Sequence, residues 1–204
     1  MRKEMKRLCQ MLRSFPLAEG ENRTKLPFLS VHFYKTRKID MPRTDHFYIY
    51  LVLDGSVRLY TPSGILDYLP GQYSVSKIDT PDSGYILTFS QQEDFLALSI
   101  ELTLNDVISV LLDLDVPAEH RGGRSPWANL APPAGAGADL RVVSAACRLF
   151  PVMEDPIQLS FLGQQIRREL IFHILCGSCG SQFLQSVIQI QQAGEIFAAN
   201  RFLR

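Results

Sequence analysis

Residues 51–77, LVLDGSVRLYTPSGILDYLPGQYSVSK, decide the fold of this chain. Short apolar runs are interrupted here by DG, TPSG and LPGQ, and each interruption has the composition of a tight turn. Pro62 and Gly64 suit the second and fourth positions of a type I turn. Pro70 and Gly71 suit a type II turn, because glycine accepts the positive φ that the third position needs. The chain is therefore predicted to reverse direction repeatedly between short strands.

Runs of the same kind lie on both sides of this stretch. They are rich in aromatic and β-branched residues and are bounded by Pro, Asp and Gly, as strands are. In all they predict about seven strands: LPFLSVHFYKT (26–36), HFYIYLVLD (46–54), VRLY (57–60), ILDYL (65–69), QYSVSKI (72–78), GYILTFS (84–90) and FLALSIEL (95–102). Strands this close together, with no helix between them, pair mostly antiparallel, which predicts a sandwich or a small barrel. The run FYIYLVL is apolar on both faces, so we expect that strand to be covered on both sides.

A short amphipathic helix is predicted at the N-terminus. Its apolar stripe consists of Met1, Met5, Leu8 and Leu12, at steps of four, three and four residues. Basic residues surround this stripe, and no long apolar segment follows it, so the N-terminus does not have the pattern of a secretory signal. We expect the helix to dock on the body of the protein.

Helices are also predicted after the strands. TLNDVISVLLDL (103–114) offers Thr103 or Asn105 as N-cap. Residues 116–139, rich in Pro, Gly and Ala, read as a loop or hinge. The next helix carries a stripe of Leu140, Val143, Cys147 and Phe150.

The following helical segment, DPIQLSFLGQQIRRELIFHIL (155–175), begins with Asp155 as cap and Pro156 in the first turn. Its stripe is Leu159, Leu162, Ile166, Leu170 and either His173 or Ile174. Residues 182–204 are helical again, with a bend expected at Gly194. This last helix reaches Arg204 with neither a capping residue nor a breaker, so we expect the natural chain to continue.

Charge and composition exclude several classes of protein. Lys and Arg number 21, as do Asp and Glu, so the net charge is zero. This balance argues against unaided binding to a nucleic-acid backbone, which needs uncompensated positive charge. No apolar run approaches the roughly 20 residues that cross a bilayer. Four cysteines without a secretory signal favour reduced thiols and a cytoplasmic protein.

Neither a redox centre nor a metal site is predicted. CGSC (176–179) is a lone CxxC between two helices, which favours a helix-to-helix turn over a redox pair or half of a zinc site. Metal-binding cupin barrels use a His-x-His pair, a nearby Glu and a later His. His32 and His46 are far apart and neither belongs to such a pair, so we expect no metal and no cofactor.

Catalytic signatures are equally scarce, whereas tyrosines are plentiful. The sequence contains no GxSxG, P-loop or GxGxxG motif. All seven tyrosines fall on predicted strands or at their ends: Tyr34, Tyr48, Tyr50, Tyr60, Tyr68, Tyr73 and Tyr85. Buried tyrosines fill a barrel yet keep a hydroxyl to satisfy, which suits an interior that is part core and part pocket.

The order of these parts resembles a known family. A Thr-x-x-Pro segment (Thr24 to Pro27) is followed by LVLDGSVRL, DYLPGQYSVSKIDTP and FLALSIELT, and then by the helix LNDVISVLLDL. Together they resemble the N-terminal regulatory domain of AraC/XylS-type bacterial transcription regulators. The resemblance implies an α+β fold, with an antiparallel cupin-like β-barrel of the double-stranded β-helix type followed by a small helical subdomain.

The resemblance also implies how the chain is organised. We expect an N-terminal helix and lead-in segment (1–25), a cupin-like barrel (26–102), a helix with a Pro/Gly-rich linker (103–138) and a helical dimerisation subdomain (139–204). In such regulators a helix-turn-helix DNA-binding domain follows, here expected after residue 204. This chain would then form a homodimer, sense an unidentified small-molecule effector in a metal-free barrel, and meet DNA only through that further domain.

Candidate residues follow from this hypothesis. Pocket-lining candidates are Tyr34, Tyr50, Arg58 and Tyr73; Arg58 is included because a buried guanidinium could meet a carboxylate or a sugar hydroxyl. Candidates for subunit pairing are Leu184, Val187, Ile188 and Ile196. Two alternatives stay open: a stand-alone, metal-free cupin enzyme of isomerase type that uses tyrosines or His46 as acid–base groups, and a purely structural oligomerisation domain with a filled barrel.

Overall fold

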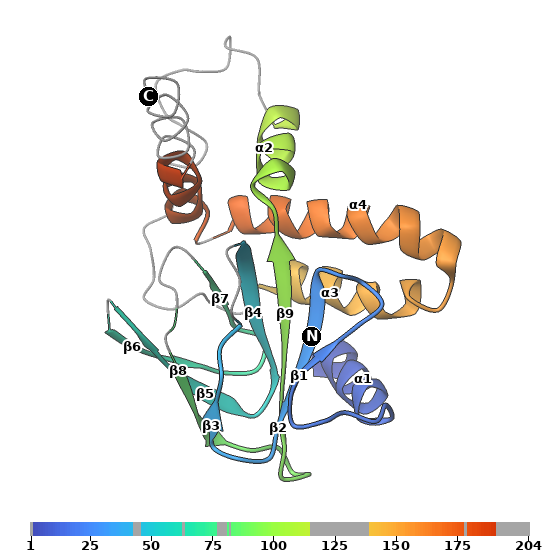
Figure 1. Cartoon of the computed structure of the whole chain (residues 1–204), viewed down its shortest axis with the longest axis vertical. Helices are drawn as coiled ribbons and strands as arrows, with labels where there is room; N and C mark the ends of the chain where they lie inside the picture. The colour runs from blue at the N-terminus through green and yellow to red at the C-terminus, as the bar shows by residue number, and fades with distance from the viewer. Residues whose placement is uncertain are drawn as a thin grey trace, which may run out of the picture.

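Two antiparallel β-sheets face each other in the computed structural model, which describes residues 2–42, 46–62, 64–76, 81, 83–114, 139–177 and 179–190 (Figure 1). The five-stranded sheet has the order β1-β2-β9-β4-β7, and the four-stranded sheet has the order β3-β8-β5-β6. The strands are β1 (Gly20–Arg23), β2 (Leu29–Tyr34), β3 (Lys38–Ile39), β4 (Phe47–Asp54), β5 (Ser56–Thr61), β6 (Gly64–Tyr68), β7 (Tyr73–Val75), β8 (Ser83–Thr88) and β9 (Phe95–Leu102). The seven predicted strands are confirmed. The structure adds β1 and β3, which are too short and too polar to be predicted as strands from their sequences.

The turns that close the barrel have the expected chemistry. Gly71 has a φ of 88°, and the amide of Gln72 donates to the carbonyl of Leu69 at 2.9 Å, which confirms the type II turn. Gly55, between β4 and β5, has a φ of 80°. A Cβ at Gly55 would lie 2.7 Å from the carbonyl oxygen of Thr88, so glycine is required there for two reasons.

The five-stranded sheet lies between the four-stranded sheet and the helices (Figure 1). Strand β4 shows why its sequence is apolar throughout. Ile49 and Leu51 pack into the core that the sheet shares with the helices, whereas Tyr48 and Tyr50 pack between the two sheets. The prediction that this strand is covered on both sides is therefore confirmed.

Helices cover the outer face of the five-stranded sheet. They are α1 (Arg2–Arg13), α3 (Leu140–Val152), α4 (Pro156–Leu175) and the helix Gly180–Ile190, whereas α2 (Leu104–Asp113) projects beyond the end of β9 and packs against α4 (Figure 1). The N-terminal amphipathic helix is confirmed by α1, whose Met5, Leu8 and Leu12 are buried. Among the described residues no single helix is long and apolar enough to cross a membrane; α4 and Gly180–Ile190 reach that length only as a pair, bent by 109°.

Predicted caps are confirmed at two helices. Thr103 caps α2 in a capping box with Asp106, so Thr103 rather than Asn105 is the N-cap. Asp155 caps α4 and Pro156 is its first residue. The described residues of the CGSC segment, Cys176, Gly177 and Cys179, lie between the end of α4 and the helix Gly180–Ile190 and are not helical, which agrees with the predicted turn.

Two predicted core positions are wrong. Leu140 at the start of α3 is 57% exposed, and Leu162 on α4 is 37% exposed. On α4 the buried position belongs to Gly163, where a Cβ would lie 2.9 Å from the side chain of Leu26, so the helix approaches the protein body through its glycine. Nearly all of the predicted 116–139 linker, and the predicted bend at Gly194, lie outside the described residues.

Candidate functional site

The side chains that the two sheets direct at each other form what we call the barrel interior. Its buried apolar and aromatic members are Tyr34, Ile39, Met41, Tyr48, Tyr50, Val52, Val57, Leu59, Tyr68, Ile86, Phe95 and Ala97. The four-stranded sheet contributes aliphatic groups from its central strands, namely Val57, Leu59 and Ile86. Its edge strand β6 adds Tyr68, whereas the five-stranded sheet contributes polar groups from its central strands, so the middles of the two walls differ in chemistry.

Hydroxyl groups form a row across the five-stranded sheet. Ser30 of β2 lies opposite Ser99 of β9, Ser99 lies opposite Tyr50 of β4, and Tyr50 lies opposite Ser74 of β7. Because residues directly opposite each other on neighbouring strands share a face of the sheet, all four hydroxyls point to the barrel interior. All four residues are buried. We call this row, together with His32 and Tyr48, the polar wall.

His32 is the buried histidine of the polar wall and is only 1% exposed. Its Nε2 atom lies 2.8 Å from the Oγ atom of Ser99, and its ring centroid lies 5.1 Å from that of Tyr50. Burial lowers the pKa of His32 to about 4, although the carboxylate of Glu21 acts in the opposite direction. The imidazole is therefore neutral at pH 7.

Four polar atoms of this wall are buried without a hydrogen-bond partner among the described residues. They are Nδ1 of His32, the hydroxyl oxygens of Tyr48 and Tyr50, and Oγ of Ser74. A buried polar atom left without a partner costs about 1–3 kcal/mol, and native proteins leave few of them. Four on one wall mark a polar surface whose hydrogen bonds the described residues leave incomplete.

The tyrosines of the wall are neutral donors. Burial raises the pKa of Tyr48 to about 12 and raises that of Tyr50 well above its usual value. With His32 neutral as well, each of these side chains keeps its protonation state across the neutral range. The wall can therefore donate and accept hydrogen bonds but carries no charge of its own.

Two of the four predicted pocket residues reach the barrel interior. Tyr50 belongs to the polar wall, and Tyr34 packs beside it with its hydroxyl donating to the carbonyl oxygen of Asp40 at 3.1 Å. Both come from central strands whose alternate side chains point inward. Whether either residue contacts a ligand stays a prediction.

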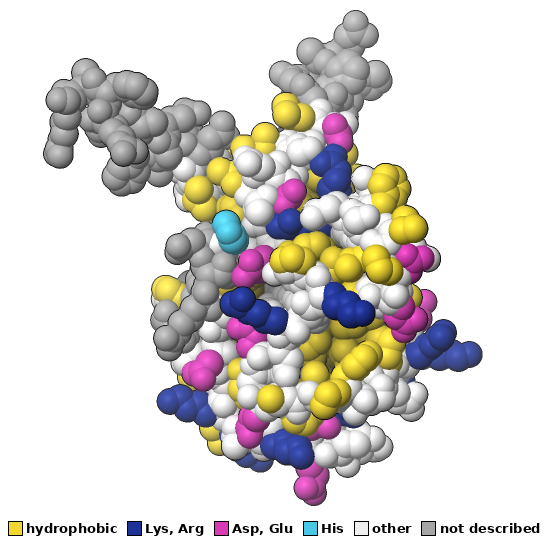
Figure 2. All heavy atoms as spheres, turned by 45° about the vertical axis from the view of Figure 1, so that its right-hand side comes forward, with side chains coloured by type: hydrophobic (Ala, Val, Ile, Leu, Met, Phe, Trp, Pro, Cys, Tyr) yellow, Lys and Arg dark blue, Asp and Glu magenta, His cyan; other side chains and the backbone are white. Residues whose placement is uncertain are grey.

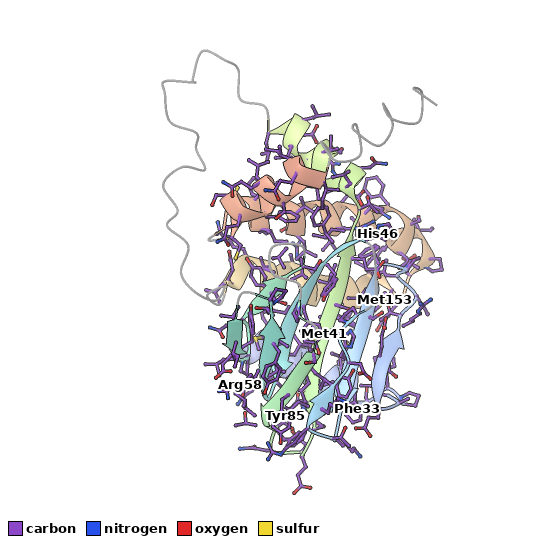
Figure 3. All side chains as sticks on the ribbon, turned by 60° about the vertical axis from the view of Figure 1, so that its left-hand side comes forward. Phe33, Met41, His46, Arg58, Tyr85 and Met153 are labelled. Carbon is purple, nitrogen blue, oxygen red and sulfur yellow. The ribbon has the colours of Figure 1, made fainter. Side chains whose placement is uncertain are left out.

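The other two predicted pocket residues do not line the barrel interior, which corrects the expectation. Arg58 alternates with Val57 and Leu59 and thus lies on the outer face of β5, where it donates to both carboxylate oxygens of Asp67 at 2.7 and 2.8 Å. Figure 3 shows Arg58 on the outside of the strands, whereas Met41 lies within the barrel. Tyr73 alternates with Ser74 and therefore packs on the opposite side of the sheet, into the helical core.

The predicted pairing residues are distributed between core and surface. Val187 is only 1% exposed, because it packs with Phe183 into the core of its own chain, where the rings of Phe183 and Phe47 meet edge to face at 5.3 Å. Its assignment to a subunit interface is corrected accordingly. Leu184 is half-buried and Ile188 is 44% exposed. Ile196 lies outside the described residues.

Sequence reasoning missed the most polar part of the site. His32, Ser74 and Ser99 were not among the predicted pocket residues, yet they belong to the polar wall. A signal was present: Ser30, His32 and Tyr34 alternate along β2 with apolar residues, as strand residues facing one side do. Each of these residues alone resembles an ordinary core position, and only the pairing of the strands brings them together.

Metal ligands do not gather in the part of the chain that the structure describes, where no group of three or more His, Cys, Asp or Glu side chains is arranged to hold an ion. A hollow of about 390 Å³ lies on the surface between the ends of α1 and α3. Its lining is largely apolar and includes Met11, Phe15 and Met153. Figure 2, which brings this side forward, shows hydrophobic side chains gathered near the middle of the face. None of the unpartnered polar atoms lies in that hollow.

The sequence profile of one protein family matches most of the chain. This family is described as AraC-type transcriptional regulator N-terminus, and the match covers residues 25–182. It includes strands β2 to β9 and all of α2, α3 and α4, and it begins just after β1. No curated protein matches the chain.

Solved structures give distant likenesses. The chain is 12% identical to apo ToxT K231A from Vibrio cholerae, over 72% of this chain and 55% of that chain, with a TM-score of 0.45. The chain thus spans little more than half of the ToxT chain. Protein NMB1881 from Neisseria meningitidis is 13% identical, over 47% of this chain and 96% of its own, with a TM-score of 0.33. A cupin domain from Bordetella pertussis is 14% identical, over 43% of this chain and 97% of that chain, with a TM-score of 0.29.

Proposed function

Because this chain belongs to the AraC-type transcriptional regulators, as the N-terminal domain of that family, we propose that it senses a small molecule in its barrel interior and pairs with a second copy of itself. The fold is the predicted α+β class, a cupin-like antiparallel barrel followed by helices. Regulation of transcription is the role of the family. Ligand binding and dimerisation are the parts that we propose.

The observation that carries the proposal is the polar wall. Four buried polar atoms on one face of one sheet lack partners among the described residues. A barrel that served only as a structural core would be more stable with apolar groups in these positions, since each unpaired atom costs free energy. A ligand that supplies the missing hydrogen bonds would recover this free energy on binding.

The protonation states of the wall favour binding over acid–base catalysis. A general acid or base works best when its pKa lies near the working pH. Burial moves the pKa of His32 down to about 4 and that of Tyr48 up to about 12, and it raises that of Tyr50 as well. The enzyme alternative therefore gains no support from these groups.

The route from the barrel interior to the helices runs through the central strands. On β9, Ser99 faces the polar wall while Leu98 and Ile100 face the helical core. The carbonyl of Glu101, at the end of the same strand, accepts from Nε of Arg167 on α4 at 2.9 Å. The same guanidinium lies 2.9 Å from Asp106, in the capping box of α2. A ligand that displaces β9 would thus change the positions of α2 and α4. The coupling free energy between ligand binding and this change would be about 1–3 kcal/mol, as is typical of allosteric proteins.

Pairing of two copies is proposed through the helix Gly180–Ile190. Its exposed apolar groups are Ile188 and Ile190, and Leu184 is half-buried beside them. We keep Ile196 as a further candidate. With a net charge of zero, the chain itself is not suited to hold DNA, and we assign DNA contact to a separate domain of the regulator.

A thermal-shift screen of small metabolites on this chain tests the proposal, because a ligand that binds only the folded state raises the melting temperature. Each compound that raises it is then measured on Tyr50→Phe and on Tyr60→Phe. Tyr60 is a suitable control because it is 40% exposed and alternates with the inward-facing Leu59 on β5. We expect the shift to shrink in Tyr50→Phe and to persist in Tyr60→Phe. Shifts that are equal in both variants would place binding elsewhere and contradict the proposal.

A further inference from the structure

The charges of the barrel interior restrict what it can bind. Among the described residues, the buried side chains that are charged at neutral pH are Asp94 and Arg167, and neither belongs to the interior. Asp94 accepts from Nε of Arg13 at 2.9 Å, where the end of α1 meets the barrel. Arg167 lies on α4, on the helical side of the five-stranded sheet.

One carboxylate approaches the polar wall from its edge. Glu21 of β1 lies opposite His32, and its Oε1 accepts from Oγ of Ser30 at 2.7 Å. Glu21 is exposed, so water screens its charge. Its sign is unfavourable for an anion, and its position at the strand edge leaves the centre of the wall uncharged.

We infer that the ligand of the barrel interior is an uncharged small molecule with hydroxyl or carbonyl groups along one edge and hydrocarbon on the opposite face. This inference rests on the proposed function. An ionised carboxylate or ammonium would lose its hydration in the interior without meeting an opposite charge there, which is a large penalty. A hydroxyl or carbonyl group needs only hydrogen bonds, which the polar wall offers.

The two-faced character of the ligand follows from the two walls. On one side the ligand meets Nδ1 of His32 and the hydroxyls of Tyr48, Tyr50 and Ser74. On the other side it meets mainly hydrocarbon, from Val57, Leu59 and Ile86 of the two central strands, and Tyr68 stands at the edge of that wall, on β6. A molecule with polar groups all around would leave some of them unpaired against the aliphatic wall.

The polar wall accepts either donors or acceptors from the ligand. Each hydroxyl can do both. The two nitrogens of neutral His32 have opposite roles, so when Nε2 accepts from Ser99 its Nδ1 donates, and when Nε2 donates its Nδ1 accepts. Hydroxyl and carbonyl groups are thus both matched.

A balanced fragment library tests the inference. The library holds equal numbers of uncharged, anionic and cationic compounds of similar size, and each is added at millimolar concentration to wild type, Tyr50→Phe and Tyr60→Phe in a thermal-shift assay at pH 7.5. Compounds that raise the melting temperature of wild type and of Tyr60→Phe are then titrated into each protein by calorimetry. For a true ligand of the polar wall, we expect Tyr50→Phe to weaken the affinity by roughly tenfold, the usual effect of one hydrogen bond.

The outcomes separate the inference from the function on which it rests. The inference is supported if uncharged compounds predominate among the ligands whose binding is weakened by Tyr50→Phe. The inference is overturned if anionic or cationic compounds predominate among these ligands, and the proposed sensing function then still stands. Finding no Tyr50-dependent ligand in any of the three sets overturns both.

Discussion

The Nε2 atom of His32 lies 2.8 Å from the Oγ atom of Ser99, and this contact joins strands β2 and β9 inside the barrel. Ser99 in turn lies opposite Tyr50 of β4, so the polar wall crosses the three middle strands of the sheet and reaches Ser74 on the edge strand β7. The opposite faces of those strands pack against the helices. Any rearrangement at the wall therefore acts on strands that also carry the helical core.

Removing the unpaired hydroxyl of Tyr50 is expected to stabilise the protein in the absence of ligand. Tyr50→Phe removes a fully buried polar atom without a described partner, so the free energy of unfolding should rise by about 1 kcal/mol. Urea denaturation measures this change. The exposed Tyr60→Phe serves as control and should change the stability by less than about 0.5 kcal/mol. A loss of stability in Tyr50→Phe would mean that its hydroxyl already has a firmly held partner.

Acid is expected to destabilise the fold through His32. Its ordinary pKa is 6.5 and its pKa in the fold is about 4, so between these values the unfolded chain binds more protons than the folded one. The contribution of His32 to stability is complete above pH 6.5 and is lost as the pH falls towards 4, by up to about 3 kcal/mol.

Denaturation curves at pH 7 and pH 5 check this prediction in wild type, His32→Gln and His46→Gln. His32→Gln should show a smaller difference between the two pH values than wild type does. The exposed His46 is the matched control, and its variant should keep the wild-type difference. An unchanged pH difference in His32→Gln is the result that rules out this role.

Arg167 is expected to be an important polar link between strand β9 and the helices α2 and α4. Its guanidinium donates to Glu101, pairs with Asp106 and lies 4.8 Å from the ring of Phe28. Arg167→Met should lower the free energy of unfolding by about 2 kcal/mol, because it leaves two partly buried acceptors, the Glu101 carbonyl and the Asp106 carboxylate, without this donor.

Arg148→Met is the matched control for this arginine. Arg148 pairs with Glu169, but its side chain is 51% exposed, so its loss should cost less than about 1 kcal/mol. Equal effects of the two substitutions in urea denaturation would show that the Arg167 contacts contribute no more than a surface ion pair.

Subunit pairing is expected to depend on Ile188. Ile188→Asp places a charge on the exposed apolar side of the helix Gly180–Ile190 and should weaken dimerisation at least tenfold, measured by sedimentation equilibrium. Gln185→Asp adds the same charge at another exposed position of that helix and should leave dimerisation nearly unchanged. If both variants associate like wild type, pairing uses another surface.

The sequence predicted the architecture better than the site. Turn residues such as Gly71 and caps such as Thr103 act locally, so they could be placed from the sequence alone. The predicted apolar stripe of α4 is wrong at Leu162. Gly163 lets α4 approach Leu26, and this tertiary contact cannot be read from the helix sequence alone.

The site could be predicted only in part, because it depends on strand alternation and pairing. Tyr50 was found as an aromatic residue on a central strand. Arg58 and Tyr73 were misplaced because a shift of one residue along a strand moves a side chain to the opposite face. Ser74 and Ser99 belong to the polar wall because strand pairing places them opposite Tyr50, and this pairing joins strands that are far apart in the sequence.

The most direct measurement of the central claim is a crystal structure of the chain with an uncharged compound that stabilises it. We predict that the compound lies between the two sheets, with a hydroxyl or carbonyl oxygen within hydrogen-bond distance of the Tyr50 hydroxyl or of Nδ1 of His32. A compound bound instead in the surface hollow between α1 and α3, with the polar wall unchanged, would contradict the account.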